Sequence, residues 1–251
     1  MASSMEKCPI IYKVLYIINA IFWDMVNTTN VLIKAVIFDM DGVLIDTKEA
    51  HFHAWQKYME SKGFDDYKRT VYNQSMGRQT REILVEYVEK FSLKIDDIEK
   101  DTLLKESLLD VSEISLFLGV KETLDLLKQE EFKLVLATSA IGVDLKDRVK
   151  RYGFDEDFDA FICSDEVKFS KPDPEIFIKG AEKVNIAPEN CVVIEDAVHG
   201  IIAAKKAGMK AIALTTTFPK DKFKKMEDEF KPNLIINNIA ELPTAIKNLN
   251  D

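Results

Sequence analysis

The sequence predicts an α/β fold, in which a doubly wound parallel sheet carries an inserted helical subdomain. From residue 34 onward, short apolar runs that end in polar or turn residues alternate with stretches of helical periodicity. This order is typical of a parallel sheet covered by helices. One stretch, 47–115, interrupts the alternation and shows helical periodicity alone. We therefore expect the insertion directly after the first strand.

Six apolar runs predict strands that are buried on both faces, because they are rich in Val and Ile and lack strict alternation. They are KAVIFD (34–39), FKLVLATS (132–139), AFICS (160–164), CVVIED (191–196), KAIALTTT (210–217) and NLIIN (233–237). Helical periodicity separates them over 121–129, 143–152, 174–184 and 200–207. Strand and helix in alternation indicate a Rossmann-like core. The charged run 220–231 mixes both signs and predicts a solvated helix.

The insertion shows three helical stretches, 51–62, 78–91 and 98–111. Ligands of open α/β sheets bind at the carboxyl ends of the strands, so an insertion at this point is expected to lie over the site as a lid. We divide the chain into an N-terminal extension at 1–31, a core domain at 32–46 and 116–251, and a helical cap domain at 47–115.

Composition limits the partners of this chain of 251 residues. Its net charge of −9 argues against nucleic acid, which requires a basic face, but leaves room for a small phosphorylated metabolite. Cys8, Cys163 and Cys191 form neither a disulfide framework nor a zinc pattern, which favours a reducing cytoplasm. We expect a monomer.

The N-terminal stretch 9–26 is strongly apolar, yet Lys13, Asn19 and Asp24 interrupt it. A membrane span needs about 20 mainly apolar residues, and a signal peptide needs a basic start and a small-residue cleavage site. We therefore predict an accessory helix or an upstream extension, with no membrane partner.

Acidic residues stand at the ends of two predicted strands. Asp39 ends the first strand and Asp41 follows two positions later, while CVVIED delivers Glu195 and Asp196 to the same edge. Carboxylates placed so closely repel one another unless a cation relieves the repulsion. Hard oxygen ligands of this kind suit Mg²⁺. A calcium loop does not fit, because Gly42 comes two residues early for that motif.

Two further strand ends complete a predicted phosphate cradle. FKLVLATS ends in the hydroxyl side chains Thr138 and Ser139, and Lys171 precedes a helix that a proline opens. A lysine at this position can neutralise a phosphoryl group. Each signal is weak alone, but their joint order at the ends of predicted strands is specific.

With these residues the chain resembles the haloacid dehalogenase (HAD) superfamily, over about residues 32–245 and closest to the subfamily of β-phosphoglucomutase and sugar-phosphate phosphatases. The resemblance implies that Asp39 attacks phosphorus and becomes an aspartyl-phosphate. Asp41 would be the general acid and then the general base. The Asp41 carbonyl, Asp39 and Asp196 would hold Mg²⁺ with Glu195 in support, and Thr138 and Lys171 would hold the phosphoryl group.

The predicted cap offers four candidate substrate residues. The run DTKEAHFHAW matches the mutase closely at His51, which either positions Asp41 or packs the cap. Arg78 and Arg81 follow Gly77 and could grip a second phosphate or a sugar. Lys100 lies where the resemblance implies a substrate-facing lysine, although its charged surroundings favour a solvated one.

The residues after Thr138 decide between two reactions. The resemblance implies side-chain donors there for the second phosphate of a mutase intermediate, but this chain has Ala140, Ile141 and Gly142. This favours a Mg²⁺-dependent phosphatase acting on a small metabolite, such as a sugar phosphate. A phosphohexomutase is the alternative. A binding protein that has lost its chemistry is disfavoured, because Asp39, Asp41, Lys171 and Asp196 are all present.

Overall fold

A computed structural model describes residues 32–250 of the chain. The predicted N-terminal extension at 1–31 lies outside these residues. Within 32–250, every helix is too short or too polar to cross a membrane.

The core is a six-stranded sheet in which all neighbouring strands are parallel, in the order β5-β4-β1-β6-β7-β8. The strands are β1 (Ala35–Phe38), β4 (Lys133–Ala137), β5 (Ala160–Ile162), β6 (Cys191–Glu195), β7 (Lys210–Leu214) and β8 (Leu234–Ile236). Each lies within one of the six apolar runs, so the predicted α/β fold is confirmed. β1 is central and pairs with β4 on one side and β6 on the other.

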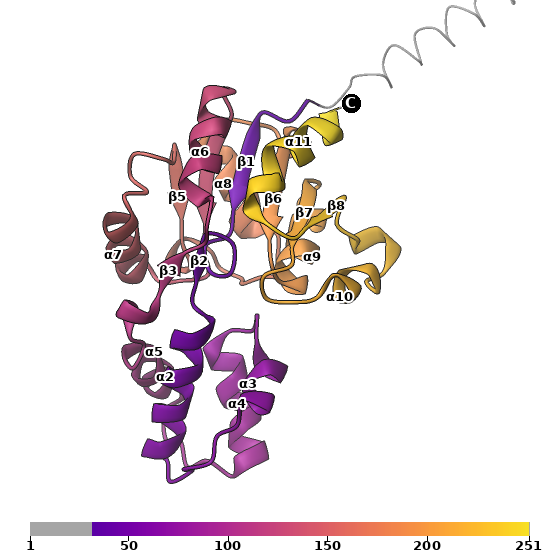
Figure 1. The fold of residues 1–251 in the computed structure, drawn as a ribbon. Helices are drawn as coiled ribbons and strands as arrows, with labels where there is room; N and C mark the ends of the chain where they lie inside the picture. The colour runs from indigo at the N-terminus through magenta and orange to yellow at the C-terminus, as the bar shows by residue number, and fades with distance from the viewer. Residues whose placement is uncertain (1–31, 251) are drawn as a thin grey trace, which may run out of the picture.

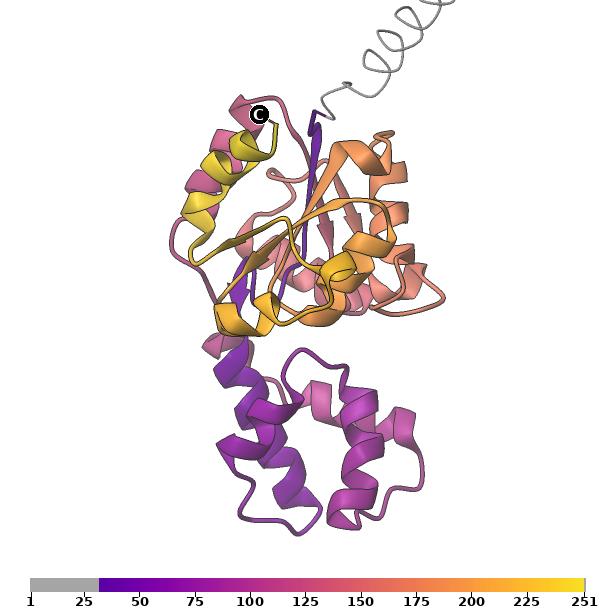
Figure 2. The same ribbon diagram turned by 90° about the vertical axis from the view of Figure 1, so that its right-hand side faces the viewer.

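Helices cover both faces of the sheet (Figures 1 and 2). Successive residues of β1 point to opposite faces, so Val36 and Phe38 enter one apolar cluster while Ala35 and Ile37 enter another. The first cluster takes in α6 (Val120–Gln129), α7 (Gly142–Tyr152) and α11 (Leu242–Asn250). The second takes in α8 (Glu175–Lys183), α9 (Val198–Lys206) and α10 (Lys220–Lys224).

The inserted stretch forms helices beyond the carboxyl ends of the strands, as both views show (Figures 1 and 2). They are α2 (Lys48–Ser61), α3 (Arg69–Ser75), α4 (Thr80–Phe91) and α5 (Ile98–Ser107). Their apolar cluster, which includes Trp55, Tyr58 and Tyr87, is separate from the two clusters of the sheet. This separate core supports the proposed division into a core and a cap at 47–115, which stays a prediction.

Some elements differ from the predictions in length or were missed. α5 ends at Ser107, short of the predicted 111, and the charged run 220–231 is helical only over α10 and a 3-10 turn at Asp228–Phe230. A two-stranded antiparallel pair, β2 (Ile45–Asp46) and β3 (Ser115–Leu116), joins the insertion to the sheet. Strands of two residues carry no periodicity, so the sequence does not predict them.

Candidate active site

The sheet order brings the polar strand ends together. β4, β1 and β6 are neighbours, so Thr138, Asp39 and Glu195 emerge side by side at one edge. The chain turns sharply after Asp39 through Gly42, whose φ of +79° favours glycine. A Cβ on Gly42 would lie 1.9 Å from Oδ2 of Asp196, so a glycine also makes room for the carboxylate.

Asp39, Glu195 and Asp196 form a buried acidic cluster. One carboxylate oxygen from each lies within 4.8 Å of the others. Burial and the neighbouring Glu195 raise the pKa of Asp39 to about 8. Burial, Glu195 and Asp39 likewise raise the pKa of Asp196 well above its ordinary value. The cause of both shifts is negative charge crowded into a site with little water.

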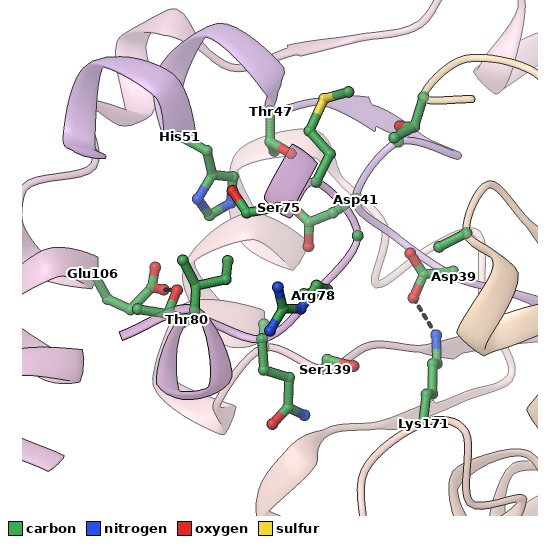
Figure 3. A pocket seen from close by; sticks show the side chains of 18 of the residues that line it. Asp39, Asp41, Thr47, His51, Ser75, Arg78, Thr80, Glu106, Ser139 and Lys171 are labelled. Carbon is green, nitrogen blue, oxygen red and sulfur yellow. Dashed lines mark hydrogen bonds and ion pairs between the residues drawn. The ribbon is translucent and has the colours of Figure 1, made fainter. Parts of the chain in front are cut away.

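Lys171 supplies the cationic partner of this cluster. Its Nζ donates to Oδ1 of Asp39 at 2.5 Å (Figure 3). It also donates to Oε2 of Glu195 at 2.9 Å. Burial alone would lower the pKa of Lys171, but the two carboxylates outweigh it and raise the pKa. Three carboxyl groups share one ammonium, so the site lacks the positive charge that would ionise all three together. This donor set fits a hard divalent cation such as Mg²⁺.

Asp41 has a cationic partner of its own, which the sequence analysis missed. Nη1 of Arg148 donates to Oδ1 and Oδ2 of Asp41 at 2.8 and 2.9 Å. Arg148 extends from α7, and its side chain is only 8% exposed. A sequence signal does exist: Leu145, Arg148 and Tyr152 share one helix face by spacing, so a charge interrupts an otherwise apolar stripe.

The two hydroxyl residues after β4 have different surroundings. Thr138 is buried, and its Oγ1 accepts a hydrogen bond from the Ala140 N–H at 3.1 Å. Ser139 lines the cavity with Lys171 (Figure 3). Of the predicted phosphate-binding hydroxyls, Ser139 therefore faces the cavity and Thr138 supports the loop beneath it.

The cavity lies between the carboxyl edge of the sheet and the inserted helices. Its volume is about 430 Å³, and its wall includes Asp39, Asp41, Lys171 and Asp196 from the core. From the helices it includes His51, Thr80, Lys105 and Glu106. A cavity of this size suits a small ligand.

His51 contacts another residue of the inserted helices. Its Nδ1 lies 2.7 Å from Nζ of Lys105. Lysine can only donate, so Nδ1 accepts. Burial and the Lys105 charge lower the pKa of His51 to about 4, which keeps the ring neutral. Within the described chain, this hydrogen bond goes to Lys105, and the Asp41 carboxylate is bound by Arg148. The role of His51 stays a prediction.

The other predicted cap residues differ in their surroundings. Arg78 and Arg81 both line the cavity, but Arg78 pairs with Glu86 and Arg81 Nε donates to Glu99 at 2.7 Å. The side chain of Lys100 is 82% exposed and pairs with Asp97, so it lies in solvent, away from the cavity wall. Lys105, one and a half helical turns further along α5, lies in the wall instead.

The comparisons with known proteins agree with this geometry. A family model described as haloacid dehalogenase-like hydrolase matches residues 36–214. The phosphorylated carbohydrates phosphatase of Thermotoga maritima is 38% identical over 188 residues, 71% of this chain and 83% of that protein. The β-phosphoglucomutase of Bacillus subtilis is 34% identical over 191 residues, 72% of this chain and 83% of that protein.

A solved structure extends the likeness to the whole fold. The crystal structure of β-phosphoglucomutase from Clostridium difficile is 25% identical, with a TM-score of 0.72, and covers 87% of this chain and 97% of its own. The family model, the relatives and the shared fold agree with the acidic cluster and the helical insertion. The chain is an enzyme of the haloacid dehalogenase-like hydrolase family.

Proposed function

We propose that this protein is a Mg²⁺-dependent phosphatase that hydrolyses a small phosphorylated metabolite, a sugar phosphate, through an aspartyl-phosphate on Asp39. The observation that carries the proposal is the pairing of two aspartates with two separate cations at the floor of one cavity. Lys171 holds Asp39, and Arg148 holds Asp41. The turn after β1 thus offers Asp39 as a nucleophile and Asp41, two residues later, as a proton carrier.

The reaction divides into two displacements. In the first, an Oδ of Asp39 attacks phosphorus, the ester P–O bond breaks, and Asp41 gives its proton to the leaving oxygen. In the second, water attacks the same phosphorus, Asp41 takes back a proton, and the bond from Asp39 to phosphorus breaks to release phosphate. Lys171 and Ser139 hold the phosphoryl oxygens throughout.

The metal would be held by carboxylates of Asp39 and Asp196 and by the backbone carbonyl of Asp41, with Glu195 in support. When bound, Mg²⁺ supplies positive charge for the phosphoryl group, where charge stabilisation carries most of phosphoryl-transfer catalysis. The clustering of three buried carboxyl groups, whose mutual repulsion raises the pKa of Asp196, supports this assignment.

Hydrolysis is favoured over isomerisation by the loop after β4. Ala140 and Ile141 line the cavity there without a side-chain hydrogen-bond donor, whereas a mutase must hold a second phosphate while it turns a bisphosphate around. The alternative of a phosphohexomutase draws support from the similar Bacillus subtilis enzyme, whose name is β-phosphoglucomutase.

One assay separates the two reactions. Purified protein with Mg²⁺ is given β-glucose 1-phosphate and a trace of glucose 1,6-bisphosphate, and free phosphate and glucose 6-phosphate are followed together. Free phosphate in excess supports the phosphatase, and glucose 6-phosphate in excess supports the mutase. A panel of sugar phosphates extends the assay, and loss of all phosphate release in Asp39→Asn is expected.

A further inference from the structure

The cap wall of the cavity presents a fixed carboxylate. Figure 3 shows Glu106 and Thr80 across the view from Asp39 and Lys171. Oε1 of Glu106 accepts hydrogen bonds from Oγ1 of Thr80 and from Nζ of Lys105, the latter at 3.2 Å. Among the residues that the structure describes, both bonds end on Oε1, so Oε2 is available to a ligand.

Glu106 is ionised, and it faces the cavity more openly than its cation does. Burial would raise the pKa of Glu106, but the Lys105 charge and the hydrogen bond from Thr80 outweigh it and lower the pKa to about 2. The Lys105 side chain is 1% exposed and packs over the Trp55 ring, whereas the Glu106 side chain is 30% exposed. A ligand therefore meets the anion first, with the cation behind it.

Each of the two cavity-lining arginines that could receive a second phosphate already has a glutamate partner. Arg78 pairs with Glu86, and Arg81 pairs with Glu99. A carboxylate accepts hydrogen bonds and donates none, so it binds hydroxyl groups and repels phosphate. Like charges brought together at a binding surface cost enough free energy to exclude a ligand.

We propose that Glu106 is a specificity-determining residue, which accepts a hydroxyl group from the end of the substrate remote from the scissile phosphate and excludes bisphosphates. This inference rests on the proposed function and narrows its substrate class to monophosphates with a hydroxyl-bearing remote end. The same exclusion works against a mutase, whose bisphosphate intermediate would place a phosphate beside Glu106.

The test compares fructose 6-phosphate with fructose 1,6-bisphosphate, which differ by one phosphate at the remote end. In Glu106→Gln the side chain keeps its size and an oxygen acceptor but loses its charge. The ratio of kcat/KM for the bisphosphate to kcat/KM for the monophosphate should rise by about tenfold or more. Glu89→Gln removes the same charge from an exposed cap position outside the cavity and should leave the ratio unchanged.

A binding experiment gives the same comparison without turnover. Both ligands are titrated calorimetrically, with Mg²⁺ present, into Asp39→Asn protein with and without Glu106→Gln. If Glu106→Gln lowers the dissociation constant of the bisphosphate relative to that of the monophosphate, the role of Glu106 is supported. An unchanged ratio, or a wild-type preference for the bisphosphate, would overturn it. If Glu106 discriminates between the two ligands in binding but wild-type protein releases phosphate from no sugar phosphate, the proposed phosphatase function is refuted and the role of Glu106 in binding is not.

Discussion

Two cationic side chains, Lys171 and Arg148, each bind different acidic residues at the floor of the cavity. Lys171 neutralises part of the Asp39 and Glu195 charge, and Arg148 fixes the carboxylate of Asp41. The proposed proton carrier is thus oriented by a side chain from α7, in the core, and not by the cap. Arg148 lies in α7 and Asp41 directly follows β1, so both partners belong to the part of the chain around the sheet.

Arg148 can be tested as a positioning residue. Arg148→Met keeps an unbranched apolar stem but leaves Asp41 without its partner, so kcat should fall on the order of tenfold or more while KM changes little. Arg148→Lys should recover part of kcat, since a lysine can still donate to Asp41. Steady-state kinetics of both variants, at matched thermal stability, checks this; equal kcat in Met and Lys variants would contradict it.

Sequence patterns predict the residues at strand ends far better than those reached from helices. Asp39, Glu195 and Asp196 follow from the strands alone, because a parallel sheet carries its strand ends to one edge. Arg148, Lys105 and Glu106 enter the cavity from helices, where tertiary packing decides which face turns inward. Lys100 and Lys105 lie on the same helix, and the packing of α5 on α4 and α2 separates the solvated lysine from the buried one.

At the scale of elements, the approach of α9 to β6 determines where Glu195 lies. Gly200 lies in the first turn of α9, and a Cβ there would come within 2.1 Å of Cδ of Glu195. The helix therefore packs directly against the carboxylate that Lys171 holds. Glycine is unfavourable inside helices by about 1 kcal/mol relative to alanine, so its presence here is explained by space and not by helix propensity.

Gly200→Ala should lower kcat/KM by on the order of a hundredfold, because the methyl group displaces Glu195 and with it Lys171. Gly180→Ala is the matched control, since its Cβ would lie 3.3 Å from Cγ1 of Val135, with the apolar side chains of Ile162 and Ile37 as its next neighbours. We expect kcat/KM of Gly180→Ala to stay within about threefold of wild type. Steady-state kinetics of both variants measures kcat/KM. A wild-type kcat/KM in Gly200→Ala would contradict the claim that the close packing of α9 positions Glu195.

The contact of α2 with α5 makes stability depend on pH. The pKa of His51 is about 4 in the folded protein against an ordinary 6.5, so between these values the unfolded chain binds a proton that the folded chain does not. The contribution is full above pH 6.5 and is lost as pH falls toward 4. It amounts to about 2 kcal/mol between pH 7.5 and 5.

Urea unfolding at pH 7.5 and 5 measures this contribution. His51→Asn keeps an acceptor for Lys105 but cannot titrate, so it should lose about 2 kcal/mol less stability than wild type over that interval. His53→Asn, on the same helix and paired with Glu113 at the surface, should follow wild type. The same pH dependence in all three proteins would show that His51 does not titrate as described.

At the scale of the whole molecule, the sheet with its covering helices and the inserted helices, whose apolar cluster is separate, meet at one cavity. The sheet supplies the acidic cluster and Lys171, and the inserted helices supply His51, Lys105 and Glu106. The alternation of strands and helices predicted the sheet and the inserted helices, because long buried runs carry a clear signal. The short β2 and β3, and the inward faces of the cap helices, depend on contacts between distant segments and leave no pattern of their own.

The most direct test of the proposed mechanism is to trap the phosphoryl group on Asp39. In Asp41→Asn the second displacement lacks its base, so the aspartyl-phosphate should persist. Acetyl phosphate is the phosphate donor, because acetate is a good leaving group and the first displacement then needs little acid catalysis. Mass spectrometry after incubation with Mg²⁺ and acetyl phosphate should find one phosphoryl group on Asp39, absent from Asp39→Asn/Asp41→Asn. An adduct on another residue, or an unmodified chain, would contradict the proposed mechanism.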